Sequence, residues 1–169
     1  MDSPLRIECT SYPGGLPDGL SVVRDLRYRV LREPLGMPFE TTLFAGDELS
    51  STRHVVGTLG ERPVGCLTLL VPEQAPHAAQ SSVSALSVQL RGMAVLGELQ
   101  GHGIGGQLLF FVQSIAEREG WELWCHARQS AMGFYAQHGW VVEGEPFEIP
   151  KIGTHFVMRW RPVATGGTG

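Results

Sequence analysis

Four glycines fall within six residues and lead directly into an apolar helical pattern: Gly101, Gly103, Gly105 and Gly106. From Ile104 to Ile115 apolar residues recur at intervals of three and four, which predicts an amphipathic helix. Gly120 suits the left-handed residue that follows such a helix. Glycines let a ligand approach the main chain closely, and a helix N-terminus favours an anion. The stretch therefore predicts a turn that binds an anion at the start of a core helix.

Three other interpretations of the glycines are weaker. A Walker P-loop needs Lys and Ser or Thr after its last glycine, but Gln107 and Leu108 follow Gly106. The dinucleotide fingerprint G-x-G-x-x-G matches from Gly101, but that motif normally follows a strand directly, near the start of a doubly wound sheet. Here five residues separate the motif from the preceding predicted strand, and two or three predicted strands come before it. The last interpretation is a glycine-rich turn that only caps a core helix.

The remaining chain predicts a mixture of helices and strands. A helix over 16–32, ended by Pro34, carries Arg24, Arg27, Arg29 and Arg32, which we expect on a solvated face, with a site for an acidic ligand as the alternative. A second helix spans 130–138, with Ser130 as its N-cap and Gly139 after its end. Strands are expected in two runs within 53–71 joined by a turn at 60–63, and over 85–95, 121–127, 140–144 and 154–160. Residues 72–84 predict a surface loop.

Composition limits the class of protein. The chain has 169 residues, of which 43% are apolar, and this fits one domain over 1–162 followed by a flexible tail over 163–169. A net charge of −4 argues against binding to nucleic acid or to an anionic membrane. Because no long apolar run or secretion signal is visible, we expect a cytoplasmic protein. The three cysteines predict reduced, buried thiols, and no spacing of histidines or cysteines indicates a metal site.

Two motifs in order resemble the GNAT N-acetyltransferase superfamily. Met93-Ala94-Val95, a four-residue link and then Gln100-x-x-Gly103-x-Gly105 resemble its coenzyme A signature. About thirty residues later, "ARQSAMGFYAQHGW" resembles the element in which a helix bearing Phe-Tyr is followed by a glycine, an aromatic residue and a strand. The similarity is good over roughly 85–160 and weaker before it.

The resemblance implies an α/β (α+β) fold: a mixed, mostly antiparallel central sheet of six to seven strands, flanked by helices and splayed at the acyl-CoA site. It also implies acetyl-CoA as cosubstrate and a small-molecule or peptide amine as its partner, with a homodimer possible. The cofactor-binding residues expected from it are Met93, Ala94, Val95, Gln100, Gly101, His102, Gly103, Ile104, Gly105, Gly106, Arg128 and Phe134.

The implied reaction is direct attack of an amine on the thioester within a ternary complex. A main-chain N–H near Val95 would stabilise the oxyanion, and Tyr135 would protonate the departing thiolate, unless it is a packing residue. Where some members carry a catalytic Glu, this chain has Gln89, which cannot accept a proton. His155 is the catalytic base that we predict, with a structural role as its alternative; Glu48, Glu98 or a water chain are other candidates. The missing Glu also leaves open a CoA-binding regulatory module without catalysis.

Overall fold

Seven strands form one sheet in the computed structural model, which describes residues 3–11, 19–73 and 85–164. The strand order is β1-β2-β3-β4-β5-β7-β6, and only the β4–β5 pair is parallel. The strands are β1 Leu5–Ser11, β2 Arg53–Leu59, β3 Arg62–Leu70, β4 Leu86–Val95, β5 Trp121–Arg128, β6 Val141–Ile149 and β7 Gly153–Trp160. The α-helices are α1 Gly19–Arg27, α2 Ile104–Glu119 and α3 Met132–Gln137. This architecture confirms the mixed, mostly antiparallel sheet that the resemblance implies.

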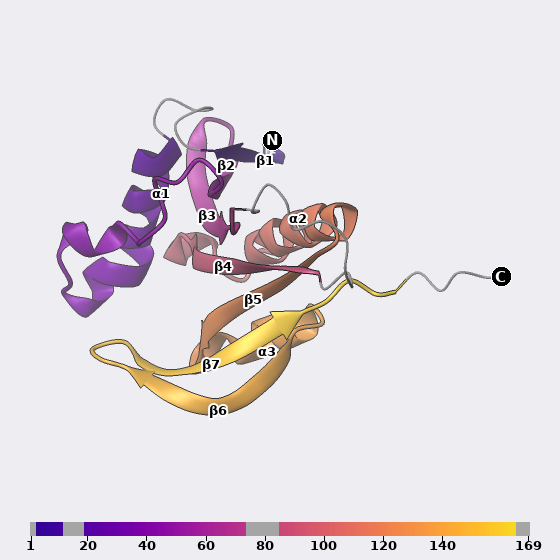
Figure 1. Ribbon diagram of the computed structural model, residues 1–169. Coiled ribbons are helices and arrows are strands. Elements are labelled where there is room, and N and C mark those ends of the chain that lie inside the picture. The colour runs from indigo at the N-terminus through magenta and orange to yellow at the C-terminus, as the bar shows by residue number, and fades with distance from the viewer. Residues whose placement is uncertain (1–2, 12–18, 74–84, 165–169) are drawn as a thin grey trace.

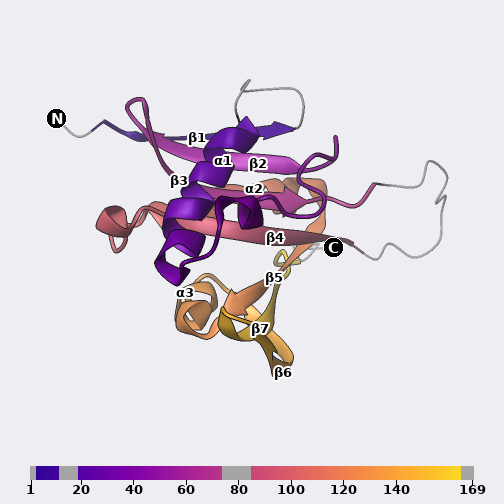
Figure 2. The same cartoon turned by 90° about the vertical axis from the view of Figure 1, so that its left-hand side faces the viewer.

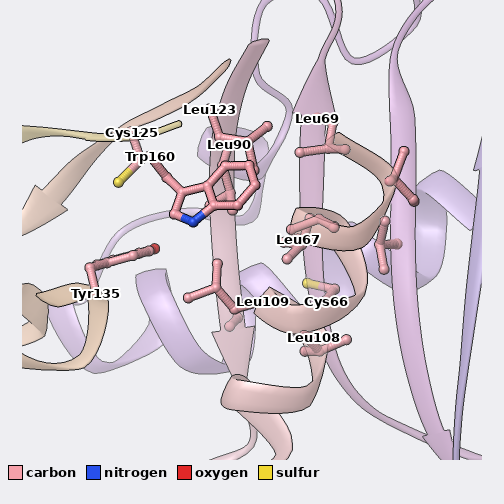
Figure 3. Close-up of a cluster of buried hydrophobic side chains, with 14 of the residues drawn as sticks. Cys66, Leu67, Leu69, Leu90, Leu108, Leu109, Leu123, Cys125, Tyr135 and Trp160 are labelled. Carbon is pink, nitrogen blue, oxygen red and sulfur yellow. The ribbon is translucent and has the colours of Figure 1, made fainter. Parts of the chain in front are cut away.

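Helices cover both faces of the sheet. Figure 2 shows α1 in front of β2, β3 and β4, with α2 behind them, and Figure 1 shows α3 beside β5 and β7. The core lies mainly between α2 and the sheet, where Leu67 and Leu69 of β3 meet Leu108 and Leu109 of the helix (Figure 3). A Cβ on Gly65 would lie 2.9 Å from a methyl group of Leu108, so a glycine lets α2 pack close to β3.

The β4 and β5 strands separate partway along their length. They pair from Leu86 with Trp121 to Gln89 with Trp124, and their ladder ends there. Figure 1 shows the two strands diverging beyond this point. On its other side, β4 stays paired with β3 but carries a bulge near Gly92, whose φ is +59°. The later part of β4 is therefore bonded on one side only, which is the splayed sheet that the resemblance implies.

Most of the predicted elements are confirmed, with differences at their ends. The predicted strand over 85–95 and the helix from Ile104 match β4 and α2 closely, and Gly120 is left-handed with φ +72°. Ser130 as an N-cap is wrong, because a 3₁₀ turn over Gln129–Ala131 precedes α3 and no side chain caps that helix. The predicted strand over 140–144 is longer and extends to Ile149. The sequence analysis missed β1, and the greater part of the 72–84 loop and of the tail lies outside the described residues.

The first predicted helix differs most from the structure. Its α-helical part ends at Arg27, a π-helical turn follows over Tyr28–Arg32, and a 3₁₀ turn over Glu33–Leu35 contains Pro34. Residues 16–18 of the predicted span lie outside the described residues. The expectation of a solvated face is wrong for Arg27, whose side chain is 0% exposed. Arg27 lies on the side of α1 that faces β3 and the 42–47 segment, so its charge needs a partner inside the protein.

Arg27 finds that partner in Asp47. Its guanidinium donates to the Asp47 carboxylate at 2.6 and 3.1 Å and to the Thr68 hydroxyl at 2.8 Å. The Thr68 hydroxyl also lies 2.9 Å from Nδ1 of His54, whose Nε2 lies 2.9 Å from the main-chain oxygen of Asp47. Every one of these hydrogen bonds has a donor and an acceptor when His54 is neutral and carries its proton on Nε2: the Thr68 hydroxyl donates to Nδ1, and Nε2 donates to the main-chain oxygen of Asp47. The network joins α1, the 42–47 segment, β2 and β3. It also holds Phe44 in place, with the Arg27 guanidinium carbon 4.0 Å from the centre of the Phe44 ring.

Candidate active site

A cavity of about 940 Å³ lies where β4 and β5 separate. On the α2 side of the sheet it is bordered by the glycine turn, Phe134, Tyr135 and Cys125. On the α1 side it is bordered by residues of the turns after α1, the ends of β5 and β7, and Gln89 and Arg91 of β4. The cavity therefore passes through the sheet, and a molecule entering from either face reaches the same gap between the strands.

The glycine turn places unbonded main-chain donors at one end of this cavity. Gly101 and Gly103 have φ angles of +80° and +82°, which glycine adopts at little cost. The first helical bond of the turn runs from the Gln107 N–H to the Gly103 carbonyl, and no side chain caps α2. The N–H groups of Ile104, Gly105 and Gly106 therefore have no acceptor within the helix. A Cβ on Gly101 or Gly103 would meet nothing within 4 Å, so the space in front of the turn is open.

This geometry fits the diphosphate of an acyl-CoA. Several N–H groups and the positive end of a 16-residue helix converge on open space that borders the cavity. A Cβ on Gly105 would lie 3.4 Å from Phe134, an ordinary contact, so the packing of the protein alone does not require glycine there. A side chain larger than alanine at this position would press on Phe134 and Met93, which both line the cavity.

The end of β4 offers a main-chain N–H to the middle of the cavity. The Leu96 N–H donates to the Val64 carbonyl at 2.9 Å, so this pair is a hydrogen-bonded pair of the β3–β4 ladder. Bonded and non-bonded pairs alternate in antiparallel ladders, and the Val95 N–H and carbonyl therefore point away from β3 toward the side where β5 has diverged. The carbonyl accepts a bond from the Gln100 side chain at 3.0 Å. The Val95 N–H remains available to a carbonyl oxygen in the gap.

Tyr135 reaches the gap from α3. Figure 3 shows its ring extending inward beside Cys125 and Trp160. It is 6% exposed, and its hydroxyl lies 3.6 Å from the sulfur of Met93. Burial, and then the neighbouring Cys125, raise the pKa of Tyr135 well above its ordinary value. The phenol therefore holds its proton at neutral pH, as a group that donates a proton must.

Two histidines border the other side of the gap. Arg128 pairs with His155 across β5 and β7, and alternation along β5 puts His126 on the same face as Arg128. Nδ1 of His155 lies 2.8 Å from the Gly153 carbonyl, so Nδ1 carries the proton of the neutral ring and Nε2 can accept one. Burial, followed by the charges of His155 and Arg91, lowers the pKa of His126.

Most of the predicted site residues line the cavity. The exception among the predicted cofactor and catalytic residues is His102, which is exposed and whose Nδ1 lies 3.1 Å from the Gln100 carbonyl. Of the other candidate bases, Glu98 is exposed and pairs with Arg62, and Glu48 is exposed outside the cavity. The roles of all these residues stay predictions.

The lining residues that the sequence analysis did not predict include Arg32, Arg91 and His126. A period of two along 121–128 could have placed His126 beside Arg128. No local signal marks the two arginines, because the β4–β5 gap and the turns after α1 bring them to the cavity.

Residues 50–142 of the chain match the sequence model of the acetyltransferase (GNAT) domain family. The chain belongs to the GNAT acetyltransferase family. It is 30% identical to Uncharacterized N-acetyltransferase YitI of Bacillus subtilis over 135 residues, 79% of this chain and 86% of that protein. The family comprises N-acetyltransferases that depend on acetyl-CoA.

Solved structures agree in fold. An acyl-CoA N-acyltransferase from Pseudomonas aeruginosa aligns over 92% of this chain and 99% of its own, with a TM-score of 0.74 and 20% identity. A GNAT family acetyltransferase from Elizabethkingia anophelis with acetyl-CoA bound aligns over 94% and 98%, with a TM-score of 0.59 and 17% identity. No described helix is long and apolar enough to cross a membrane. Over the same described ranges, no group of three or more His, Cys, Asp or Glu side chains could hold a metal ion.

Proposed function

We propose that this protein transfers the acetyl group of acetyl-CoA to an amine that enters from the α1 face of the sheet. The observation that carries the proposal is a single cavity that joins the unbonded N–H groups at the start of α2 to Tyr135 and His155 through the β4–β5 gap. Membership of the GNAT family supports acetyl-CoA as the donor.

The main chain would hold the donor. The N–H groups of residues 104–106 bind the diphosphate, and the unpaired edge of β4 from Met93 to Val95 binds the pantetheine arm. The Val95 N–H donates to the thioester oxygen as negative charge develops there. Acetyl-CoA supplies an activated acyl group, and the protein supplies position and proton transfer.

The side chains around the gap would move two protons. The amine nitrogen forms a bond to the carbonyl carbon as the carbon–sulfur bond breaks, and the products are an amide and a thiol. Nε2 of His155 accepts the proton that the amine loses, directly or through water, since its Nδ1 is fixed by the Gly153 carbonyl. The Tyr135 hydroxyl gives a proton to the sulfur. Solvent then returns the proton to Tyr135 and removes the one on His155.

Binding and turnover of acetyl-CoA test the proposal together. Acetyl-CoA should raise the melting temperature, because a ligand that binds only the folded state stabilises it. Thiol release should appear when an amine is added. No shift at millimolar acetyl-CoA with folded protein would reject the proposal, while binding without turnover of any amine in a broad panel would favour the CoA-binding regulatory module.

Gly105→Val gives the test a structural control. The valine methyl groups would extend past the Cβ position toward Phe134 and Met93 at the wall of the cavity, and we expect the dissociation constant of acetyl-CoA to rise by more than tenfold. Gly133→Ala serves as the matched variant, because a Cβ on Gly133 meets nothing within 4 Å and Gly133 does not line the cavity. Equal affinities for both variants would show that the glycines of the turn serve packing only.

A further inference from the structure

The α1 side of the cavity carries three arginines and no carboxylate. Arg32 follows α1, Arg91 lies on β4 and Arg128 ends β5, and all three line the cavity. None of the lining residues in the described parts of the chain is Asp or Glu. The charge on this wall is therefore positive, although the whole chain carries a net charge of −4.

The hydrogen bonds of these arginines leave their charge unbalanced. Arg91 donates to the Ala45 carbonyl at 2.7 Å, Arg32 to the Thr41 and Leu31 carbonyls at 3.3 and 3.2 Å, and Arg128 to the Leu31 carbonyl at 3.4 Å. Among described residues, none of the three has a carboxylate within ion-pair distance. Each guanidinium has five N–H donors, and most of those on these three side chains remain free to bind another group.

Two of the three arginines, Arg32 and Arg91, pack on Phe44. The guanidiniums of Arg32 and Arg91 lie 5.4 and 5.0 Å from the ring centre of Phe44, which the Arg27–Asp47 pair holds in place. The Phe44 N–H donates to the Asp47 carboxylate at 2.7 Å. The Asp47 carboxylate favours the charged form of Arg91, but it already accepts two bonds from Arg27 and forms no ion pair with Arg32, Arg91 or Arg128 among the described residues.

Burial disfavours the charge on all three arginines, and Arg128 and Arg27 also repel Arg32. Burial, then Arg128 and Arg27, lower the pKa of Arg32, and burial lowers the pKa of Arg91 and Arg128. Holding several partly buried guanidiniums together is unfavourable unless an anion joins them. A carboxylate or phosphate matches the planar donor pattern of arginine, whereas a cationic amine would be repelled.

We propose that the acceptor amine also carries a carboxylate or phosphate group, and that Arg32, Arg91 and Arg128 bind this group while the amine points into the β4–β5 gap. The inference rests on the proposed acetyl transfer and names the substrate class of that site. It assigns Arg128 to the acceptor, whereas the resemblance implied that it binds the cofactor. The diphosphate has donors of its own at the start of α2, on the other face of the sheet.

Matched pairs of amines test the inference. Phenylalanine and its amide compare a carboxylate with a neutral group, phosphoethanolamine and ethanolamine make the same comparison for a phosphate, and putrescine represents cationic amines. With thiol release as the assay, the anionic member of one or both pairs should have a kcat/KM at least tenfold higher than its neutral partner. Preference for the neutral or cationic amines, with acetyl-CoA bound and consumed, would overturn the inference alone. No binding of acetyl-CoA would overturn the proposed function as well.

Variants locate the effect. Arg91→Gln and Arg32→Gln should each lower kcat/KM for the preferred anionic amine by roughly 10- to 100-fold, the usual range for a lost hydrogen bond to a charged group. Their dissociation constants for acetyl-CoA should stay unchanged, and Arg91→Lys should restore part of the loss because it keeps the charge. Arg29→Gln is the control, since Arg29 is exposed on the same turn as Arg32 and lies outside the cavity. Equal losses with neutral amines, or weaker acetyl-CoA binding in both variants, would contradict a role in binding the anion.

Arg128→Gln separates its two assigned roles. If Arg128 binds the acceptor, the variant should raise KM for the anionic amine and leave KM for acetyl-CoA unchanged. The opposite pattern would return Arg128 to the cofactor and remove it from the proposed site.

Discussion

Replacing Asp47 with alanine would leave the Arg27 guanidinium charged and unpaired in the interior. Both side chains are at most 1% exposed, so water cannot replace the lost carboxylate. The change removes two bonds from Arg27 and one from the Phe44 N–H. Removing one partner of a buried ion pair costs about 3–5 kcal/mol. Since a domain of this size loses roughly 2–4 °C per kcal/mol, the melting temperature should fall by about 6–20 °C.

Urea unfolding at neutral pH measures the loss, and Asp25→Ala provides the comparison. Asp25 pairs with Arg29 at 3.8 Å, with 62% of its side chain exposed, and such a pair contributes about 1 kcal/mol or less. Adding Arg27→Met to Asp47→Ala removes the unpaired charge, so the double variant should be more stable than Asp47→Ala alone. A loss below about 1 kcal/mol for Asp47→Ala, equal to that of Asp25→Ala, would refute the argument that Arg27 depends on this carboxylate.

Three further outcomes follow from the pKa shifts and the packing. Tyr135→Phe removes one hydroxyl from a buried ring. The kcat should therefore fall roughly 10²-fold, the low end of the range for lost general-acid assistance, while the affinity for acetyl-CoA stays unchanged. A wild-type kcat in an assay limited by chemistry would make Tyr135 a packing residue. Burial, and to a lesser degree Arg27, lower the pKa of His54, so the unfolded chain takes up a proton that the folded protein resists, and the free energy of unfolding should decrease as pH falls below about 6.5. Equal unfolding free energies at pH 7.5 and 5.5 in urea titrations would contradict this. Burial raises the pKa of Cys66 and Cys125 to about 12, so alkylation at pH 8 followed by mass spectrometry should label the half-buried Cys9 first; labelling of Cys125 at the same rate would show that the gap opens widely.

The elements nearest the donor side could be predicted because their signals are local. The period of α2, the glycines before it and the β-rich run of β4 all lie within about thirty consecutive residues. Gly101 and Gly103 adopt φ angles near +80°, which glycine reaches at little cost. The short β1 strand gave a weaker signal. Its alternation at Leu5, Ile7 and Cys9 spans only five of the seven residues of the strand.

The acceptor side could not be predicted in this way because its contacts join distant segments. Arg27 reads as one of four arginines on a helix, and its burial depends on Asp47, twenty residues later in an irregular segment. Arg91 lines the cavity only because β5 leaves β4 after Gln89, a separation that no local pattern specifies. The resemblance implied that the sheet splays, but it did not indicate which side chains border the gap.

The division of the cavity between the two faces of the sheet has an evolutionary consequence. On the α2 face the proposed donor contacts come from main-chain N–H groups, which a substitution removes only when it introduces proline, and the glycine turn lies within the stretch that matches the family. On the α1 face the wall is made of side chains; Arg32, Phe44 and His155 come from segments outside that stretch, and Arg91 and Arg128 lie within it. Descendants of one ancestor can therefore exchange acceptor residues one at a time while retaining the same acyl donor. New amine specificities can arise after gene duplication without any intermediate that has lost its cosubstrate.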